Sequence, residues 1–369
     1  MIPVNTPLLD GNEKKYLLEC IDSGWISSEG PFVQEFEKRF AEQVGRKHGI
    51  AVSNGTAAID IVIESMEIGP GDEVILPSFT IISCISQIVR SGATPVLVDC
   101  EPDTWNMDVA QIEEKITPRT KAIMAVHIYG LPTDMQPLLD IAKKYRINVI
   151  EDAAEMHGQT YRGQPCGGFG EISTFSFYPN KLITTGEGGM IVTNNDALAE
   201  NCRELRNLCF QPKKRFVHER LGWNARMTNL QAALGLAQLE RLDALVAKKR
   251  HIGKLYSELL EGTSGIKLPI SHTDYAINIY WVFGIVLEDH ISIDANEAIS
   301  RLGKMGIGCR PFFCPMHLQP VLKRRGFFEN ESYPESERLW SRGFYVPSGM
   351  ALTDEQVCES AQKVKDILG

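Results

Sequence analysis

Residues 72–99 read DEVILPSFTIISCISQIVRSGATPVLVD, and this stretch decides the fold class. Two short apolar runs, DEVILP (72–77) and TPVLVD (94–99), flank a segment with helical periodicity, SCISQIVRSG (83–92). Short apolar runs that end in Gly, Pro or Asp are typical of buried strands. A strand, a helix and a second strand in this order predict a parallel pair joined by a right-handed crossover.

The same alternation continues on both sides of this unit. Further strands are expected at HGIAVS (48–53), KAIMAVH (121–127), NVIEDA (148–153), STFSFY (173–178) and GGMIVT (188–193). We therefore predict an α/β fold in which a mostly parallel sheet is flanked by helices. This large domain is expected to cover residues 1–250, including the N-terminal segment.

The second half of the chain has a different pattern. Residues 196–262 are mostly helical in periodicity, and 228–250 is expected to form one long amphipathic helix. A strand near 279–287, a helix near 295–306 and a last helix from Asp354 follow. This order predicts a small C-terminal α+β domain at residues 251–369.

The composition narrows the class of protein. The 369 residues carry a formal net charge of −9, which argues against a nucleic-acid partner because its phosphates would be repelled. The nine cysteines and eight histidines lack the spacing of a disulfide framework or a zinc site, so no bound metal is expected. No signal-peptide pattern and no run of about 20 apolar residues occurs. A cytoplasmic protein without a membrane partner is expected.

A candidate anion site follows the first expected strand. Residues 53–58 read SNGTAA and lie between a strand and a helix. Gly55 permits a tight turn, and the free N–H groups at the start of a helix suit a phosphate. A Ser or Thr that only caps the helix is the alternative interpretation.

A candidate carboxylate follows a later strand, in VIEDAAE (149–155). Asp152 lies just past the carboxyl end of that strand, where open α/β sheets place ligands. A carboxylate in this position needs a cation or several hydrogen-bond donors, and a protonated pyridine nitrogen is one such cation. Capping of a following helix is the alternative role for Asp152.

The sharpest signal is TFSFYPNKLITTGEGGMIVT (174–193), which places Lys181 in a loop between two expected strands. Its neighbours are small or apolar, so its amine would be partly desolvated, as suits a lysine that attacks a carbonyl. An exposed surface lysine is the alternative. Taken together, an anion site, a buried carboxylate and a sheltered amine are the three features that pyridoxal phosphate needs.

Longer stretches resemble the DegT/DnrJ/EryC1/StrS family of sugar-nucleotide aminotransferases, a branch of the fold-type I pyridoxal-phosphate enzymes. The similarity runs nearly from end to end. It is most specific in FSFYPNKLITTGEGGMIVTNN (175–195) and RMTNLQAALG (226–235), and it includes GPGDEVILPSFT (69–80) and ITPRTKAIMAVHIYG (116–130).

The resemblance implies a role for each matching residue. Lys181 would form the Schiff base with the cofactor and move a proton between cofactor and substrate. Asp152 would pair with the pyridine nitrogen, and Glu155 would lie near the ring hydroxyl. The other implied cofactor contacts are the phosphate ligands Gly55, Thr56 and Ser176, then Ile81 at a position usually held by a stacking aromatic, and Asn229, which would reach the neighbouring subunit's phosphate. For Asn229, a helix N-cap is the alternative.

Residues 8–37 and 310–320 resemble the GDP-perosamine synthases, the branch that aminates C4 of GDP-4-keto-6-deoxymannose for surface polysaccharides such as O-antigen. This likeness implies that Arg310 and His317 lie near the nucleotide or sugar. It also places three residues against the hexose, namely Trp25, Ile26 and Ser27. Basic residues at 213–215 and 323–325 could attract the diphosphate, with solvated loops as the alternative.

The resemblance also implies L-glutamate as amino donor and a homodimer or tetramer with shared active sites. Two alternatives stay open: an aminotransferase for another 3- or 4-keto UDP- or dTDP-sugar, and a non-catalytic regulatory protein that binds a nucleotide sugar or the cofactor. Lys181 argues against the related sugar 3-dehydratases, which have histidine at that position. A Rossmann dehydrogenase is disfavoured because no G-x-G-x-x-G follows the first strand.

Overall fold

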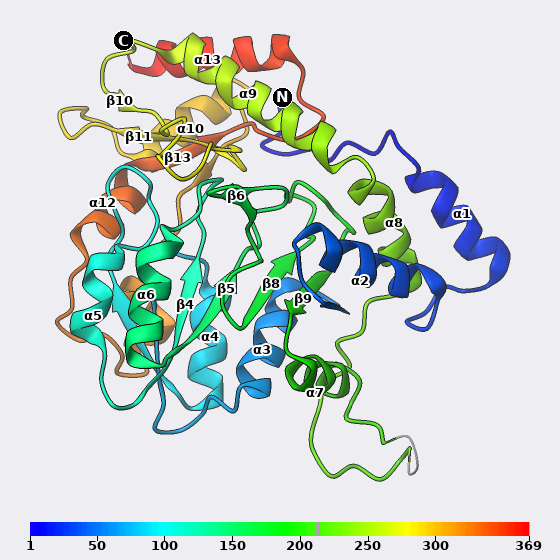
Figure 1. Cartoon of the computed structure of the whole chain (residues 1–369). Helices are drawn as coiled ribbons and strands as arrows, with labels where there is room; N and C mark the ends of the chain where they lie inside the picture. The colour runs from blue at the N-terminus through cyan, green and yellow to red at the C-terminus, as the bar shows by residue number, and fades with distance from the viewer. Residues whose placement is uncertain (212–214, 369) are drawn as a thin grey trace.

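The computed structural model describes residues 1–211 and 215–368, which form a large unit built on one sheet and a smaller unit above it (Figure 1). The seven strands of the large sheet lie in the order β1-β9-β8-β5-β4-β2-β3. Only β9 runs antiparallel to its neighbours, so the predicted mostly parallel sheet is confirmed. The strands are β1 (His48–Val52), β2 (Glu73–Pro77), β3 (Thr94–Val98), β4 (Thr120–Val126), β5 (Asn148–Asp152), β8 (Ile172–Ser176) and β9 (Gly189–Thr193).

Helices cover both faces of this sheet, which explains why its strands are apolar throughout. Successive side chains of a strand point to opposite faces. In β2, accordingly, Val74 and Leu76 belong to one core cluster, and Ile75 belongs to the other. The first cluster also takes in α3 (Gly55–Ser65), α4 (Ile82–Ser91) and α7 (Asp196–Arg206), and the second takes in α2 (Pro31–Gln43), α6 (Met135–Tyr145) and α8 (Asn229–Leu239).

The prediction of a single long helix at 228–250 is wrong. The chain forms α8 and then α9 (Leu242–Leu260), with Arg241 between them in a non-helical conformation. The break has a packing reason: α8 lies against α1 (Glu13–Ser23) and α2, whereas α9 lies against α13 (Asp354–Leu368). Sequence periodicity alone does not reveal such a change of partner.

The smaller unit contains a four-stranded sheet in the order β10-β11-β13-β12. The strand expected near 279–287 is shorter than predicted, since β11 covers Phe283–Leu287. The other strands and the main helices of this unit are β10 (Ile266–Lys267), β12 (Arg310–Pro311), β13 (Gly343–Val346), α10 (Ala295–Lys304), α11 (Pro320–Lys323) and α12 (Pro334–Arg342).

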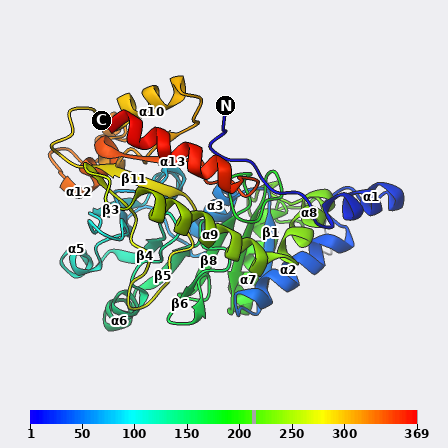
Figure 2. The ribbon, with the colours of Figure 1, turned by 90° about the horizontal axis from the view of Figure 1, so that it is seen from above.

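Two features bear on the predicted domain division at residue 250. That residue lies in the middle of α9, which runs beside α13 (Figure 2). The N-terminal segment also passes beside the smaller unit, since Ile2 forms a β-bridge with Ile307 and packs in the core of that unit. The division into 1–250 and 251–369 therefore stays a prediction, with α9 as the link between the units.

Short elements complete the description: η1 (Val109–Gln111), α5 (Ile112–Lys115), β6 (Thr160–Tyr161), β7 (Gln164–Pro165) and η2 (Met316–Leu318). Among the described residues, no helix combines the length and the apolar character that crossing a bilayer would require.

Candidate active site

One cavity lies where the carboxyl ends of the large sheet face the small unit. It measures about 610 Å³ and is bounded by residues that follow β1, β2, β4, β5 and β8. Open α/β sheets place their ligands at this edge. The cavity is lined by seven residues that the sequence singled out: Gly55, Thr56, Ile81, Asp152, Glu155, Ser176 and Lys181.

The start of α3 forms one end of this cavity. Asn54 caps the helix, and its Oδ1 accepts a hydrogen bond of 2.8 Å from the Ala57 N–H. The N–H groups of Gly55 and Thr56 come before the first intrahelical bond, so they can bind an anion. A Cβ on Gly55 would lie 2.8 Å from the Ser176 Cβ. Glycine therefore leaves the space beside Ser176 that a phosphate would need.

Asp152 lies at the end of β5 and is 4% exposed. Its Oδ1 accepts a hydrogen bond from the Ala154 N–H (3.1 Å), and its Oδ2 accepts one from the Cys84 thiol (3.1 Å). Burial, together with the charge of Asp152, raises the pKa of Cys84 well above its usual value, so the thiol stays protonated and donates. The chain continues into a turn after β5, so Asp152 caps no helix here.

Lys181 reaches into the cavity from the loop between β8 and β9. Its side chain is 11% exposed, which rules out the alternative of a surface lysine. The Nζ atom lies 3.6 Å from Glu155 Oε1 and 4.0 Å from the centre of the Trp281 ring. The Tyr129 N–H donates a 2.7 Å hydrogen bond to Glu155 Oε2. Burial raises the pKa of Glu155 to about 7, although the Lys181 charge acts in the opposite direction.

The sequence reasoning missed His157, which supports the lysine loop. Its ring stacks with those of Phe175 and Phe177, and its Nδ1 accepts a hydrogen bond from the Ile183 N–H (3.3 Å). Burial and the Lys181 charge lower the pKa of His157 to about 3, so the ring is neutral. His157 follows Glu155 by two residues, so the motif that revealed Glu155 could also have revealed it. Nothing local in the sequence pointed to Trp281, Cys84 or Tyr129.

Asn229 lies outside the cavity and is fully buried. Its Nδ2 donates to the Trp25 carbonyl (2.7 Å), its Oδ1 accepts from the Phe32 N–H (2.8 Å), and its backbone N–H donates to the Ser27 carbonyl (2.8 Å). The N-cap of α8 is the preceding threonine, so the N-cap alternative is wrong. Asn229 thus fastens the segment that holds Trp25, Ile26 and Ser27, which do not line the cavity of this chain. Its contact with a neighbouring phosphate stays a prediction.

The two other predicted substrate residues are placed differently. Arg310 lines a smaller cleft beside the cavity, and the two share Tyr178, Asn180, Trp281 and Tyr345. His317 is 1% exposed, with its Nδ1 2.8 Å from Ser78 Oγ and its Nε2 3.0 Å from Glu337 Oε1. Because both ring nitrogens are engaged, the position of His317 does not support its predicted contact with nucleotide or sugar. Residues 213–214 of the basic cluster lie outside the described residues.

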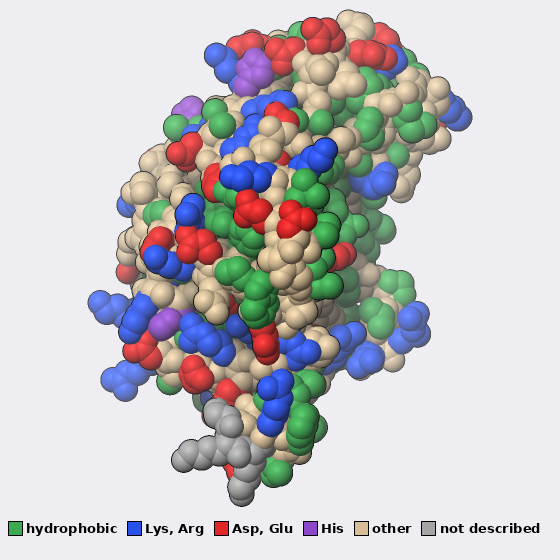
Figure 3. Space-filling view, turned by 90° about the vertical axis from the view of Figure 1, so that its right-hand side faces the viewer, with side chains coloured by type: hydrophobic (Ala, Val, Ile, Leu, Met, Phe, Trp, Pro, Cys, Tyr) green, Lys and Arg blue, Asp and Glu red, His purple; other side chains and the backbone are tan. Residues whose placement is uncertain are grey.

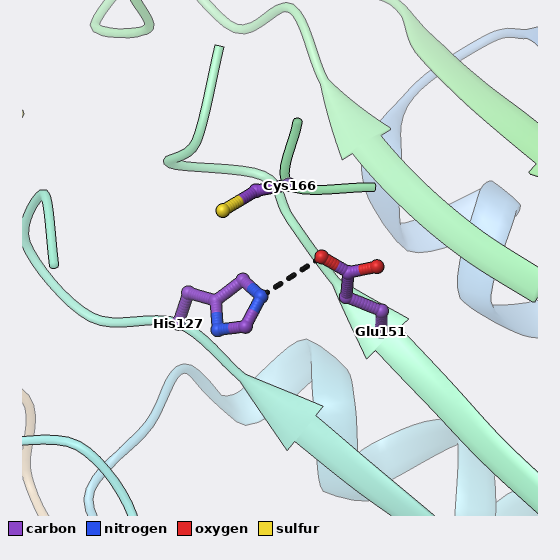
Figure 4. Close-up of side chains that lie close together, drawn as sticks. All are labelled: His127, Glu151 and Cys166. Carbon is purple, nitrogen blue, oxygen red and sulfur yellow. Dashed lines mark hydrogen bonds and ion pairs between the residues drawn. The ribbon is translucent and has the colours of Figure 1, made fainter. Parts of the chain in front are cut away.

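His127, Glu151 and Cys166 lie close together (Figure 4), and His127 also lines the cavity. The Thr133 N–H donates to His127 Nδ1 (3.1 Å), so the ring proton is on Nε2, which donates to Glu151 Oε1 (3.0 Å). The ring therefore has no free lone pair for a metal. Glu151 accepts three further hydrogen bonds, from the Gly167 N–H (2.5 Å), the Phe169 N–H (3.0 Å) and the Ser173 hydroxyl (3.1 Å). This is a closed hydrogen-bonded network.

Pyridoxal phosphate fits the cavity on chemical grounds. The start of α3 and Ser176 offer donors to a phosphate, Asp152 offers a negative charge to a ring nitrogen, and Lys181 offers an amine to an aldehyde. The aliphatic side chain of Ile81, which is 45% exposed at the start of α4, is free to contact the ring.

Comparison with known proteins agrees with this chemistry. The chain is 49% identical over 358 residues to a GDP-perosamine synthase of Caulobacter vibrioides, covering 96% of this chain and 95% of the relative. A GDP-perosamine synthase of Vibrio cholerae is 41% identical over 369 residues, with 99% of each chain covered. Spr1654 of Streptococcus pneumoniae, solved in PLP and PMP forms, superposes with a TM-score of 0.92 at 28% identity; its PLP form aligns over 100% of this chain and 99% of its own.

The model of the DegT/DnrJ/EryC1/StrS aminotransferase family matches residues 7–365. The resemblance seen in the sequence is thereby confirmed, as is the fold. The chain belongs to the DegT/DnrJ/EryC1/StrS aminotransferase family and is a pyridoxal-phosphate-dependent sugar aminotransferase.

Proposed function

We propose that the enzyme transfers the amino group of L-glutamate to C4 of GDP-4-keto-6-deoxy-D-mannose, giving GDP-perosamine for surface polysaccharide synthesis. The carbonyl oxygen of the sugar is replaced by the amino group, and glutamate leaves as 2-oxoglutarate. The observation that carries the proposal is the meeting of Lys181, Asp152 and the start of α3 in one cavity. The sugar is inferred from GDP-perosamine synthases of 41–49% identity over nearly the full chain.

The residues of the cavity have separate tasks in this reaction. Pyridoxal phosphate supplies an aldehyde that takes up the amino group and a ring that accepts electrons. Gly55, Thr56 and Ser176 bind its phosphate, and Asp152 keeps its ring nitrogen protonated. Ile81 contacts one face of the ring. The weak thiol donor at Cys84 orients the Asp152 carboxylate and leaves lone pairs of both oxygens available.

Lys181 moves the proton that each half of the reaction requires. In the first half it acts as a base and removes the hydrogen from the α-carbon of glutamate, and in the second half it acts as an acid and delivers a proton to C4 of the sugar. A positioned base of this kind contributes about 10²–10⁴-fold to the rate. Glu155, 3.6 Å from Nζ, faces the lysine amine. By the family resemblance it would also lie near the ring hydroxyl of the coenzyme.

The homodimer belongs to the same proposal. The face on the side of α1, α2 and α8 carries hydrophobic side chains among charged ones (Figure 3). Four apolar residues of α1 and the segment after it are 48–62% exposed, namely Leu18, Ile21, Trp25 and Ile26. Apolar surface of this kind is typical of protein contacts. A second copy that covers this surface would bring Trp25, Ile26 and Ser27 towards the hexose in the active site of the neighbouring subunit. Asn229, which fastens this segment, would approach the same site.

A cytoplasmic location is also proposed. All nine cysteines are free in the structure, and this usage is typical of a reducing compartment.

The test is amine transfer from glutamate to a panel of nucleotide-linked 3- and 4-ketohexoses carrying guanine, uracil or thymine. We expect the GDP-linked 4-keto-6-deoxymannose to be aminated with one 2-oxoglutarate formed per sugar. Turnover only with a UDP- or dTDP-linked sugar would assign another substrate. Absence of transfer to every member by the coenzyme-loaded protein would favour the regulatory alternative.

A further inference from the structure

Trp281 contacts the lysine loop from the small unit. It lies just before β11, is 4% exposed, and lines both the main cavity and the cleft that holds Arg310. We propose that Trp281 is a positioning residue, the resting platform on which the Lys181 amine is held whenever it is not joined to the coenzyme. This inference rests on the proposed function of Lys181 as the attachment point.

The first support is the contact itself. The Lys181 Nζ lies 4.0 Å from the centre of the indole ring, well within the range of a cation–π interaction. Its nearest carboxylate oxygen, on Glu155, is 3.6 Å away, which is too long for a strong charge-assisted hydrogen bond. The ring face and the carboxylate therefore share the positive charge of an amine whose side chain is only 11% exposed.

The second support is that the indole ring is held by contacts of its own. Its Nε1–H donates a 3.0 Å hydrogen bond to the carbonyl of Asn180, the residue before the lysine. Tyr129 stacks near the indole with ring centres 6.0 Å apart and planes inclined by 24°. The backbone N–H of the same tyrosine binds Glu155. Trp281, Tyr129 and Glu155 thus form one connected support for the loop and its amine.

The platform has a consequence for the reaction. The first half of the transfer frees Lys181 and the second half engages it again, so the free amine needs a place close to the reacting carbon. A cation over a desolvated Trp ring is stabilised by about 0.5–2 kcal/mol, enough to favour the free lysine without trapping it. Because Trp281 belongs to the small unit, the seating of that unit on the large sheet sets where the amine rests.

If the platform is present, its removal should strengthen the binding of PLP. In the coenzyme-free protein and in the PMP form the lysine is free, whereas PLP holds it covalently. Loss of the platform in Trp281→Leu therefore destabilises the coenzyme-free protein and the PMP form alike, but it does not destabilise the PLP form. We expect PLP to bind about 2- to 30-fold more tightly to this variant and PMP to bind as before.

The measurement is equilibrium binding of PLP and of PMP to coenzyme-free wild type and variants. Trp281→Phe keeps a smaller aromatic face and should shift PLP affinity in the same direction by less, which protects the test if the leucine variant fails to fold. Trp340→Phe is the control, since this tryptophan lies on α12 and lines neither the cavity nor the cleft that holds Arg310. It should leave the ratio of the two affinities unchanged.

Equal weakening of PLP and PMP, or an unchanged ratio in both Trp281 variants, would overturn the platform and leave a merely structural tryptophan. Borohydride reduction of wild type with PLP, followed by peptide mass analysis, separates this failure from that of the proposed function. An adduct on Lys181 with an unchanged ratio refutes the platform alone. An adduct on another residue refutes the role of Lys181.

Discussion

Glu151 and Asp152 are neighbours at the end of β5, but their side chains lie in very different surroundings. Glu151 accepts four hydrogen bonds in the closed network. The one from His127 is drawn in Figure 4. Asp152 accepts two, from the Ala154 N–H and the Cys84 thiol, and lines the cavity. A carboxylate offers about four lone-pair sites, so Glu151 has none left and Asp152 has two.

This difference separates structural from functional burial. Both carboxylates are at most 4% exposed, so burial alone does not distinguish them. What distinguishes them is unused hydrogen-bonding capacity beside a cavity. Lys181 has the same property, because within the described part of the chain its amine has only a 3.6 Å contact with Glu155 and the Trp281 ring as partners. Groups left partly unsatisfied in a native structure are the ones available to a ligand.

The largest expected effect is that of Lys181→Ala. Removing the amine removes both the covalent hold on the coenzyme and the proton transfer, so 2-oxoglutarate formation should fall by about 10⁴-fold or more. The visible absorbance of the coenzyme imine should disappear with it. Lys47→Ala, at an exposed lysine paired with Asp196, is the control and should keep full turnover. Turnover that survives in Lys181→Ala would contradict the assigned role.

Glu151→Gln should disrupt the hydrogen-bonded network around Glu151, the structural carboxylate of the two at the end of β5. The new amide hydrogens would face N–H donors of the network, and buried polar groups would lose their partners. We expect the free energy of unfolding, measured by urea denaturation, to fall by about 4 kcal/mol. Turnover per folded, coenzyme-loaded molecule should change little. Glu64→Gln, at an exposed position, serves as control. An equally large stability loss in that variant would mean that the loss in Glu151→Gln does not come from the buried network.

Asp152→Asn should show the opposite pattern. The amide keeps the shape and can still accept the hydrogen bond from Ala154, but it carries no charge for the pyridine nitrogen. Loss of one electrostatic group in an active site costs about 10²–10³-fold in kcat. We expect a fall of this size in steady-state turnover, with urea stability close to wild type. A large stability loss without loss of turnover would mean that the roles of residues 151 and 152 are exchanged.

The sequence predicted the residues of the cavity better than their partners. Asp152 and Lys181 were found because strand ends and a glycine-rich loop are local patterns. Trp281 lies 100 positions after Lys181 in another unit, and Cys84 meets Asp152 only through the packing of α4 on the sheet. No periodicity encodes such contacts.

Two further expectations depended on contacts that are distant in the sequence. Residues 228–250 have continuous helical periodicity, yet Arg241 breaks the helix because α8 and α9 pack on different partners. His317 was expected near the nucleotide or sugar because residues 310–320 resemble the GDP-perosamine synthases, but Ser78 and Glu337 lie within hydrogen-bond distance of its two ring nitrogens. Long-range packing decided both cases.

Glu155 predicts a pH dependence of the coenzyme-free protein. Its carboxyl has a pKa of 4.5 when exposed and about 7 when buried in the folded chain. Between these values the folded state binds the extra proton, so the free energy of unfolding falls as pH rises. Relative to Glu155→Gln, wild type should lose about 3 kcal/mol between pH 4.5 and 7 in urea titrations. A difference that is constant with pH, or that grows in favour of wild type, would contradict the raised pKa.

The smallest expected effect concerns the thiol that faces Asp152. If Cys84 orients the carboxylate, Cys84→Ala should weaken coenzyme binding by about 3- to 10-fold, the value of one hydrogen bond, and Cys84→Ser should restore most of it because the donor returns. Cys202 is also fully buried, on α7 and away from the cavity, so Cys202→Ala reports what a missing sulfur costs through packing alone. Infrared difference spectra add a direct readout. The S–H band lost in Cys84→Ser should move to higher frequency in Asp152→Asn, because a neutral acceptor holds the thiol less strongly. A band that does not move would mean that the thiol is only packed beside Asp152, and the available capacity of that carboxylate would then owe nothing to Cys84.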